Sequence, residues 1–540
     1  MIENIKTDII KILKSINVSF SIGDVNVSVL TNNKFGDLTT NVAFIIGKKN
    51  KRNPYELANK IVALFNNENI KKIEIVKPGF INFFINKQSI FLIIKKIIKY
   101  GKKYGSDKKK NEKINIEFVS ANPTGEIHIG HARGAAYGDV LSRVLSFSGY
   151  DVTREYYVND AGNQIKKLGE SVYYRYLEFF NKKKATLELE YKGKDIIEVA
   201  RKIKRHYNDE ALNKKIDFFS KFAIKEELKN IFDILSKFNV KKFDVVTHET
   251  DICKNAKIES VLNFLKSNNY IYEKDGAKFI KTALFLDDKD RVVIKKDGLF
   301  TYFLPDIIYH YNKIERGYDK LIDVLGADHH GYINRLKSAL MMRGFDEKKL
   351  IVKIIQIVRF IKDKKEYKMS KRTGEMVSLK ELSDEISMNS IRYFLISKNN
   401  NTHVDFDYSL ARKNDNNNPV HYILYAYVRL HSVLKMAQEK KIRKNYEGNL
   451  LTTAEEKEIV KFLYDFPNII KTVSKNYEVH LIANYVFSLA KLIHSYYNKY
   501  RIVDEKNKSL SSSRLGLIAA IKIVLENALD ILGIKTVTQM

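Results

Sequence analysis

Two histidines beside a turn carry the clearest signal of chemistry in this chain. His128 and His131 stand in the sequence His-Ile-Gly-His, after a strand-like alternation and a Pro-Thr-Gly turn and before a run with helical spacing. This pattern places both rings at a helix N-terminus, which offers free backbone N–H groups and the positive end of the helix dipole. Gly130 lacks the Cβ that would hold a flat ligand away from the backbone. We therefore expect a site for an adenine ring and a triphosphate.

A basic segment far downstream supplies a second set of phosphate-binding groups. It reads Lys368-Met369-Ser370-Lys371-Arg372 and continues as Thr373-Gly374. Lys371, and with it Lys368, suits the departing β- and γ-phosphates, because a lysine on a glycine-bounded loop can close over a nucleotide and later withdraw. Taken singly, each motif has a plainer interpretation. Paired histidines on a helix usually pack or face solvent, and a basic cluster is usually a solvated loop.

The elements around these motifs predict a parallel sheet. Between Lys113 and about Lys398, strands such as 320–325 and 350–358 alternate with helical runs, as in a doubly wound sheet. A strand at 114–118 leads into the histidine motif, and a helix at 132–147 follows it. The charged, amphipathic stretch at about 169–285 resembles an insertion between the two halves of a nucleotide-binding fold.

Two further units flank this core. Residues 1–100 predict a small α/β domain, with a leading helix, a helix near 54–65 and strands at 73–76 and 80–85. Residues 101–110 are rich in turn formers and charge, which indicates a linker. After an Asn-rich connection, residues 416–540 carry the apolar spacing of a helical bundle.

Composition limits the possible classes of protein. A chain of 540 residues suggests three or four domains. Its net charge of +30 suits a polyanionic partner, although a bias toward Lys, Asn and Ile would give the same charge without selection for binding. The single cysteine, Cys253, excludes internal disulfides and predicts no structural zinc. Without a secretory signal or a long apolar run, we expect a cytoplasmic protein with no membrane segment.

In this order and at this distance, the two motifs are the signatures of class I aminoacyl-tRNA synthetases. Further segments narrow the resemblance: 120–125 (SANPTG), 153–165, 306–332, 403–411 and, in the N-terminal unit, 34–44 and 78–85. Together they resemble a bacterial arginyl-tRNA synthetase over nearly the whole chain. This implies a multidomain α/β plus all-α protein, with a Rossmann-like parallel-sheet catalytic core (113–398), an N-terminal domain that contacts the tRNA elbow, and an anticodon-binding helical bundle.

The resemblance implies an arginine–tRNA ligase. Such an enzyme activates L-arginine with ATP to arginyl-adenylate and transfers the arginyl group to the 3′-terminal adenosine of arginine tRNA, releasing AMP and pyrophosphate. His128, His131, Lys368 and Lys371 would be catalytic. The implied ATP-binding residues are Asn122, Pro123, Thr124, Gly125, His128, Gly130, His131, Asp328, Met369, Ser370 and Lys371.

The amino acid and the tRNA would be held by two further sets of residues. The implied arginine-binding residues are Glu117, Asn122, Tyr302, Asp306 and His329, and the implied tRNA-binding residues are Tyr425, Tyr500 and Met540. Tyr302 and Asp306 are four residues apart and share one helical face. Asp306 could instead be an ordinary capping carboxylate. His329 could be a core histidine or could contact the ribose or the adenine, and Tyr425 and Tyr500 could be packing groups of the bundle.

The resemblance also implies partners. We expect Mg²⁺ to accompany ATP, although no ligand set in the sequence marks its position, and we expect a monomer. Two departures from the family pattern are Pro305, where many relatives have Arg, and Gln539, where Arg is usual. The alternatives are a class I synthetase for another amino acid and a non-catalytic tRNA-binding paralogue.

Overall fold

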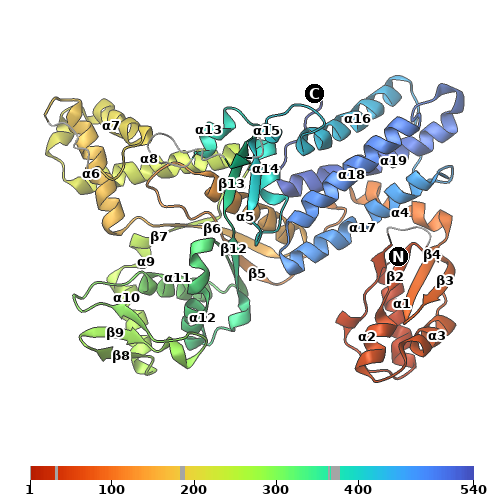
Figure 1. The fold of residues 1–540 in the computed structure, drawn as a ribbon, viewed down its shortest axis with the longest axis horizontal. Coiled ribbons are helices and arrows are strands. Elements are labelled where there is room, and N and C mark those ends of the chain that lie inside the picture. The colour runs from red at the N-terminus through yellow and green to blue at the C-terminus, as the bar shows by residue number, and fades with distance from the viewer. Residues whose placement is uncertain (1, 31–34, 183–188, 363–364, 367–376) are drawn as a thin grey trace.

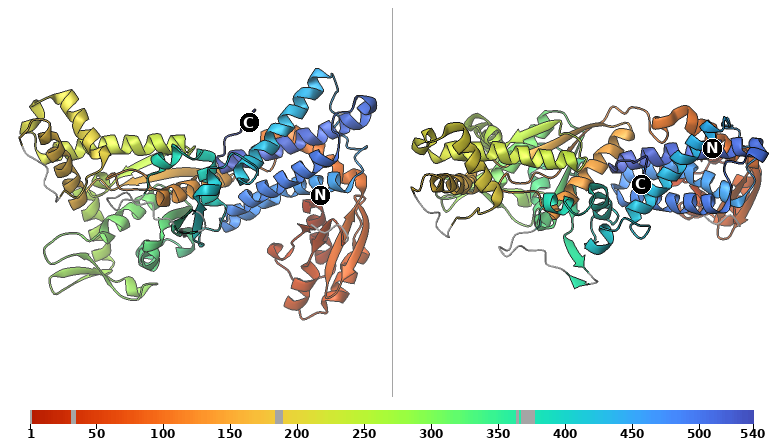
Figure 2. Two further views of the ribbon diagram at one scale, coloured as in Figure 1. Left: turned by 45° about the horizontal axis from the view of Figure 1, so that its top comes forward. Right: turned by 90° about the horizontal axis from the view of Figure 1, so that it is seen from above.

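The molecule is elongated, with the catalytic sheet near its middle. Figure 1 places the N-terminal domain below the C-terminal helices at one end and three helices of the catalytic part at the opposite end, and Figure 2 shows the same order from two other sides. The computed structural model describes residues 2–30, 35–182, 189–362, 365–366 and 377–540.

Five parallel strands form the core sheet, in the order β12-β11-β5-β6-β7. The central strand β5 pairs with β6 on one side and β11 on the other, so the chain builds the sheet outward in one direction and then returns to build the other half. In such sheets, ligands bind at the carboxyl ends of the strands where the direction reverses, here between β5 and β11. The strands are β5 (Lys113–Glu117), β6 (Asp151–Val158), β7 (Val245–His248), β11 (Lys320–Gly326) and β12 (Leu350–Ile355).

The expected insertion at 169–285 is not continuous. Three helices, α6 (Gly162–Glu178), α7 (Lys194–Tyr207) and α8 (Ile216–Lys237), precede β7, which is a strand of the core sheet. After β7 come α9 (Glu249–Ile252), α10 (Asn255–Ser267) and an antiparallel sheet of β8 (Ile271–Lys274), β9 (Ala277–Ile280) and β10 (Arg291–Ile294). The sequence reading missed β7 because its four residues, Val-Val-Thr-His, are too few to show a periodicity.

The second half of the core carries two corrections. The strand expected at 350–358 is divided, because β12 ends at Ile355 and β13 (Val358–Lys362) belongs to another sheet with β14 (Lys365–Glu366) and β15 (Val404–Asp407). The Asn-rich connection, residues 399–418, contains regular elements as well, namely β15 and the four-residue helix α15 (Tyr408–Ala411). The helices of this half are α11 (Phe303–Glu315), α12 (Ile333–Met342), α13 (Leu379–Ser383) and α14 (Met388–Ile396).

The N-terminal domain is docked on the C-terminal helices through Asp37. The carboxylate of this buried residue accepts a hydrogen bond from the Ile85 amide at 2.7 Å and pairs with Lys457 at 2.9 Å and Lys461 at 2.5 Å. The domain consists of α1 (Ile2–Ser15), α2 (Val42–Lys49), α3 (Pro54–Leu64) and a sheet of β1 (Ser28–Val29), β2 (Leu38–Thr40), β4 (Phe80–Ile85) and β3 (Ile70–Val76).

Long helices form the C-terminal bundle, as the sequence predicts. Asn418 caps the first of them by accepting a hydrogen bond from the Val420 amide, and Pro419 occupies the first helical position. The helices are α16 (Pro419–Glu439), α17 (Ala454–Asn476), α18 (His480–Lys499) and α19 (Lys508–Leu532), and α4 (Lys87–Tyr100) packs on α17 and α19. Across the described residues, no helix combines the length and apolarity needed to cross a membrane.

Candidate active site

His128 is the N-cap of α5 (Ile129–Phe147), just after the carboxyl end of the central strand. Its Nδ1 accepts hydrogen bonds from the backbone amides of Gly130 at 3.1 Å and His131 at 3.3 Å. The His131 ring stacks on the His128 ring with 3.6 Å between centroids. The motif therefore begins a helix, as expected, but two of the first-turn amides are used by His128 itself rather than left for a ligand.

The protonation of the pair follows from this geometry. Burial lowers the pKa of His128 below its usual value, and burial together with the neighbouring His128 lowers the pKa of His131 to about 3. Both rings are therefore neutral at pH 7. Because Nδ1 of His128 accepts, its proton is on Nε2, which is the donor available to a ligand. The Nδ1 atom of His131 is buried and has no hydrogen-bond partner within the described structure.

Gly130 has a reason to be glycine that the sequence did not show. A Cβ at this position would lie 3.0 Å from Cε1 and 3.1 Å from Nδ1 of His128. The ring folds back over the glycine in order to cap the helix, so the small residue makes room for this cap. Access for a flat ligand remains a prediction.

A cavity of 360 Å³ lies beside His128. Three expected ATP-site residues line it, namely Thr124, Gly125 and His128. Two lysines also line it: Lys194 is the first residue of α7, and Lys192 lies just before that helix. Pro123 is buried in the preceding turn, whereas Asn122 is exposed and donates to Gln164 Oε1 at 3.0 Å. Four carboxylates also line the cavity: Glu126, Glu190, Asp195 and Glu381.

The segment after the basic motif is attached directly to the histidine motif. Leu379 donates its backbone N–H to the Ile127 carbonyl at 2.6 Å, and His128 and Ser378 form an antiparallel bridge. Ser378 then caps α13 through its hydroxyl, with Glu381 completing the capping box. Residues 367–376, which include the predicted Lys368, Met369, Ser370 and Lys371, lie outside the described residues. The described chain resumes at Val377, directly before the Ser378 that pairs with His128.

Asp306 belongs to a cluster of acidic and phenolic groups. Its Oδ2 accepts a hydrogen bond from the Tyr332 hydroxyl at 2.5 Å. Across the cluster, the Tyr157 hydroxyl donates to Glu249 Oε2 at 3.0 Å. Burial and then the nearby charges of Asp306 and Asp160 raise the pKa of Glu249 above its usual value. Because the carboxylates of Asp306 and Glu249 repel each other, a cation such as a guanidinium would be favoured between them.

Tyr302 directly precedes α11 and Asp306 lies in its first turn, so the shared helical face expected for the two side chains remains a prediction. Tyr302 is the N-cap residue without a side-chain cap, and 81% of its surface is exposed. Asp306 is in the first turn and is not the N-cap. Asp328 and His329 lie in the short 3₁₀ helix η5 (Ala327–Tyr332) directly after β11, at the edge where ligands are expected, but their side chains are outside the described part.

Glu117 ends the central strand in a buried charge network. Its carboxylate accepts from Lys313 Nζ at 2.7 Å and from Ser120 Oγ at 2.9 Å. The fully buried Lys313 also reaches Asp323 Oδ1 at 3.1 Å on β11, so it joins the two strands that flank the expected ligand site. His310 completes the network, with Nε2 2.9 Å from Asp323 Oδ2.

In the helical bundle, Tyr425 belongs to a column of rings and one guanidinium. Its ring is stacked, at an angle of 28°, with those of His421 and His494, whose centroids are 6.3 Å and 5.7 Å away. Arg429 lies over Tyr425 at 4.5 Å and over Tyr497 at 4.8 Å. Such a column between α16 and α18 offers flat surfaces for unstacked bases.

Tyr500 has other neighbours. Its hydroxyl donates to Glu455 Oε2 at 2.8 Å, and its ring packs near Tyr496 and Arg514. Met540, the third predicted tRNA contact, is 55% exposed at the C-terminus. The structure therefore brings Tyr425 and Tyr500 into separate groups of side chains.

The sequence reading missed Glu249, Tyr157, Tyr332 and Arg429. Glu249 directly follows β7, and Tyr157 lies on β6 beside it, so a reading that had found β7 would have placed both at the carboxyl edge of the sheet. Arg429 follows Tyr425 at helical spacing, which is the signal that it shares the same face. Among the described residues, no group of three or more His, Cys, Asp or Glu side chains has the geometry to hold a metal ion.

A parallel sheet of this strand order, with a histidine pair at the first turn after its central strand, is the catalytic domain of a class I aminoacyl-tRNA synthetase. Residues 93–416 match the family model described as tRNA synthetases class I (R), catalytic domain. Residues 3–85 match the arginyl tRNA synthetase N terminal domain, and residues 423–540 match the DALR anticodon binding domain.

Similar proteins narrow the class to one family. The chain is 41% identical to an arginine–tRNA ligase of Bacillus subtilis over 94% of this chain and 92% of that protein. It is 42% identical to that of Bacillus licheniformis over 96% and 95%. The fold matches the arginyl-tRNA synthetase of Thermus thermophilus with a TM-score of 0.80 and 18% identity, covering 100% of each chain. The chain belongs to the arginyl-tRNA synthetase family and is an ATP-using arginine–tRNA ligase.

Proposed function

We propose that arginine is activated at the carboxyl edge of the sheet between β5 and β11. The arginine carboxylate attacks the α-phosphorus of ATP, the bond to the β-phosphate oxygen breaks, and pyrophosphate leaves. A hydroxyl of the terminal ribose of arginine tRNA then attacks the adenylate carbonyl, and AMP leaves. The observation that carries this assignment is the Nδ1 cap of His128, which leaves its Nε2–H as the available donor beside a cavity lined by lysines.

The histidines act on the phosphates as neutral donors. Phosphoryl transfer needs aligned groups and donors for the charge that develops on phosphate oxygens, rather than covalent help from the protein. His128 and His131 supply such donors, with Asn122, Pro123, Thr124, Gly125 and Gly130 shaping the turn around the nucleotide. Asp328 on η5 lies on the side where the ribose or the adenine would be held.

Mg²⁺ enters with ATP. The cavity beside His128 has both lysines and carboxylates in its lining, and this mixture fits a phosphate group that carries its own cation. Lys192 and Lys194 would face phosphate oxygens, while Glu126 and Asp195 would face the hydrated ion. When bound, the metal would neutralise charge on the phosphates.

Arginine is selected by two carboxylates. Asp306 and Glu249 receive the planar guanidinium, which presents five N–H donors, while Tyr157 and Tyr332 hold the carboxylates in place and Tyr302 covers the rim. At the other end of the substrate, Glu117 and Asn122 hold the α-amino and carboxylate groups. Glu117 already accepts two hydrogen bonds, but a carboxylate has about four acceptor positions and can take an ammonium as well. His329, on η5 directly after β11, is the remaining residue that we assign to arginine.

Lys371 and Lys368 bind the leaving pyrophosphate. We expect Lys371→Ala to slow adenylate formation by a factor on the order of 10² or more, because it removes a donor whose contact strengthens as the pyrophosphate charge grows. The KM for arginine should change little. The measurement is single-turnover adenylate formation, and an equal rate in the two proteins would contradict the role of this loop.

The C-terminal bundle reads the anticodon. Tyr425 lies in the column with His421, Arg429 and Tyr497, so we expect Tyr425→Ala to lose about 1–3 kcal/mol of binding to arginine tRNA. Tyr500→Ala and truncation of Met540 test the other two assignments. The measurement is binding of arginine tRNA and of an anticodon-substituted tRNA at several salt concentrations. Phosphate contacts weaken with salt, whereas the preference between the two tRNAs should persist. An unchanged preference would make a tyrosine a packing group.

The remaining proposals concern the domain limits, the compartment and the oligomeric state. We propose domain limits of 1–100, 113–398 and 416–540, supported by the matched ranges 3–85, 93–416 and 423–540. The helix α4 at the end of the first range packs on the bundle. We also propose that the enzyme is a cytoplasmic monomer. Sedimentation of the purified protein tests the oligomeric state.

One experiment tests the whole assignment. The purified protein is offered arginine tRNA, ATP and each amino acid separately, and we expect arginine alone to be attached. Attachment of a different amino acid would overturn the guanidinium pocket. Binding of tRNA without any charging would instead identify a non-catalytic paralogue.

A further inference from the structure

Arg133 is a buried guanidinium on the helix that begins at the histidine pair. It lies two residues after His131 in α5, and 1% of its surface is exposed. Its Nη1 donates to the Gln356 carbonyl at 2.5 Å, and its Nη2 donates to the carbonyls of Asn399 at 2.9 Å and Thr402 at 2.8 Å. One side chain therefore joins α5 to two segments that are far away in the sequence. We call Arg133 and its three acceptors the clamp.

Main-chain carbonyls compensate the charge of Arg133. In the described parts of the chain, no carboxylate pairs with it. Burial lowers the pKa of Arg133 to about 10, so the guanidinium remains charged at pH 7. A buried charge is costly unless hydrogen bonds satisfy it, and hydrogen bonds from a charged donor are the stronger ones. The three carbonyls are therefore held firmly around the guanidinium fork.

Both segments of the clamp are places where the chain leaves the core sheet. Gln356 directly follows β12, and the next strand, β13, belongs to the sheet of β13, β14 and β15, which we call the arm. The turn at 399–402 leads into β15. Since β13 and β15 are parallel, with Val358 opposite Val404, both strands begin beside the clamp and run away from it in the same direction.

The turn at 399–402 is also tied to the end of β12. The Gln356 amide donates to the Asn400 carbonyl at 3.0 Å, and Asn400 Nδ2 donates to the Ile354 carbonyl at 3.0 Å. The Asn400 side chain is buried, so water does not compete for these bonds. The start of the arm is thus fixed to the core sheet by Asn400 and to α5 by Arg133.

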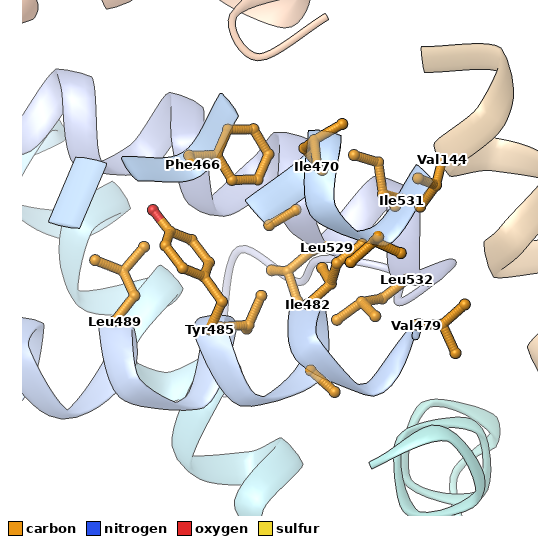
Figure 3. Packing of buried hydrophobic residues seen from close by; sticks show 14 of the residues in the cluster. Val144, Phe466, Ile470, Val479, Ile482, Tyr485, Leu489, Leu529, Ile531 and Leu532 are labelled. Carbon is orange, nitrogen blue, oxygen red and sulfur yellow. The ribbon is translucent and has the colours of Figure 1, made fainter. Parts of the chain in front are cut away.

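The helix that carries Arg133 is a firm support. Figure 3 shows Val144, near the far end of α5, beside Ile531 and Leu532, and all three belong to one buried apolar cluster. Close-packed interiors resist displacement, because they leave few voids. Because α5 is a single helix over Ile129–Phe147, Arg133 attaches the arm to the same rigid element as the histidine pair.

The arm continues into the basic motif. β14 pairs with β13 in antiparallel fashion, and the motif at 368–372 follows β14 in the sequence. The described chain returns with Ser378, which forms the bridge to His128. The described parts on both sides of the motif are therefore attached near the start of α5. Main-chain pairing attaches the downstream part, and Arg133 attaches the upstream part.

We propose that Arg133 is a positioning residue, which fixes the arm so that Lys368 and Lys371 meet the pyrophosphate that leaves beside His128. The inference rests on the proposed function, since it assumes that these lysines bind the pyrophosphate. Arg133 does not line the cavity beside His128, so it acts through the arm and not by touching the nucleotide. The proposed arginine pocket is built on α11 and on the end of β7, so a displaced arm leaves arginine binding intact.

Arg133→Lys is the central test, because lysine keeps the charge but offers a single nitrogen in place of the two-ended fork. We expect this variant to slow single-turnover adenylate formation by about tenfold or more, since a displacement of about 1 Å at a catalytic group can cost a factor of about 10². The dissociation constant of arginine should keep its wild-type value. Thermal unfolding shows whether the variant is folded.

The same substitution is then made in a background that carries Lys368→Ala and Lys371→Ala. If Arg133 acts through these lysines, its substitution has no further effect once they are gone. Two independent changes would instead multiply their factors, because their free energies add. We therefore expect Arg133→Lys to change the rate of the background protein by less than about twofold.

Arg359→Lys is the matched control. Arg359 is on β13 of the same arm, but it is exposed and pairs with Asp405 on β15, with Nη2 2.7 Å from Oδ1. Exposed ion pairs contribute little, so this variant should keep the wild-type rate. Should Arg133→Lys fail to fold, Asn400→Ala replaces it in both backgrounds. It releases the turn from Ile354 and should give a smaller loss that likewise disappears without the two lysines.

The outcomes separate the inference from the function on which it rests. A wild-type rate after loss of both lysines would refute the proposed role of the basic motif, and the inference with it. A slow background protein together with a wild-type rate in folded Arg133→Lys would overturn the inference alone. Equal slowing by Arg133→Lys in both backgrounds, or a weakening of arginine binding that matches the slowing, would also overturn it. Either result indicates general damage to the fold.

Discussion

Asp306→Asn should lower kcat/KM for arginine by a factor corresponding to about 2–5 kcal/mol, because the amide removes one anionic partner of a desolvated guanidinium. The expected loss is large because the Tyr332 hydroxyl donates to Asp306 Oδ2. If the amide NH₂ of asparagine takes the place of Oδ2, this hydroxyl loses its acceptor. The measurement is pyrophosphate exchange at saturating ATP with arginine varied, in the presence of tRNA. The KM for ATP should be unaffected.

Glu249→Gln is the companion variant. Comparing it with Asp306→Asn shows how much each of the two carboxylates contributes to arginine selection. Since the charge of Asp306 raises the pKa of Glu249, we expect Glu249→Gln to weaken arginine use less than Asp306→Asn does. Thermal unfolding of both variants shows whether the fold is intact. Full activity of folded Asp306→Asn would show that this carboxylate serves the packing of α11 against Tyr332 rather than the substrate.

His128→Ala should slow adenylate formation by a factor on the order of 10², the usual cost of removing one donor to a developing negative charge. The same change removes the cap of α5, which costs about 1 kcal/mol of stability. Single-turnover formation of the adenylate and thermal unfolding measure the two effects separately.

His128→Asn distinguishes these two roles within one residue. Asparagine is among the best N-cap residues, so its side-chain oxygen can accept from the Gly130 and His131 amides as Nδ1 does. It should restore stability without restoring the Nε2 donor. We expect His128→Asn to be as stable as the wild type and to form the adenylate slowly. A wild-type rate of adenylate formation would show that His128 serves only as the helix cap.

Local patterns predicted most of the architecture. Strand β5, helix α5 and the bundle helices α16 to α19 are long or strongly periodic, so their apolar spacing alone determines their type. The parallel sheet was predicted from the alternation of strands and helices, and the two flanking units from the turn-rich connections and the helical periodicity. Strand β7 was not predicted, because it is only four residues long. It is stabilised by pairing with β6, and such a long-range interaction leaves no pattern in the local sequence.

The candidate site divides in the same way. His128, His131 and Asp306 could be found from residue type, spacing and resemblance, since each lies in a continuous motif. Glu249 could not, because it reaches the site only through the strand that was missed. The ion pair between Glu117 and Lys313 could not be predicted either, because the two residues are far apart in the sequence. They come together only when β5 pairs with β11.

The attachment of α13 to the histidine motif is made by main-chain atoms. The Leu379 amide donates to the Ile127 carbonyl, and the bridge between His128 and Ser378 is likewise a backbone pairing. Every residue type except proline supplies these groups, so the alignment of the two nucleotide motifs does not depend on which side chains stand at 127 and 379. Both side chains are buried and must stay apolar, but an exchange of one apolar residue for another leaves the backbone pairing in place. A change in chain length between Ser378 and the basic segment would instead alter the alignment of the two motifs.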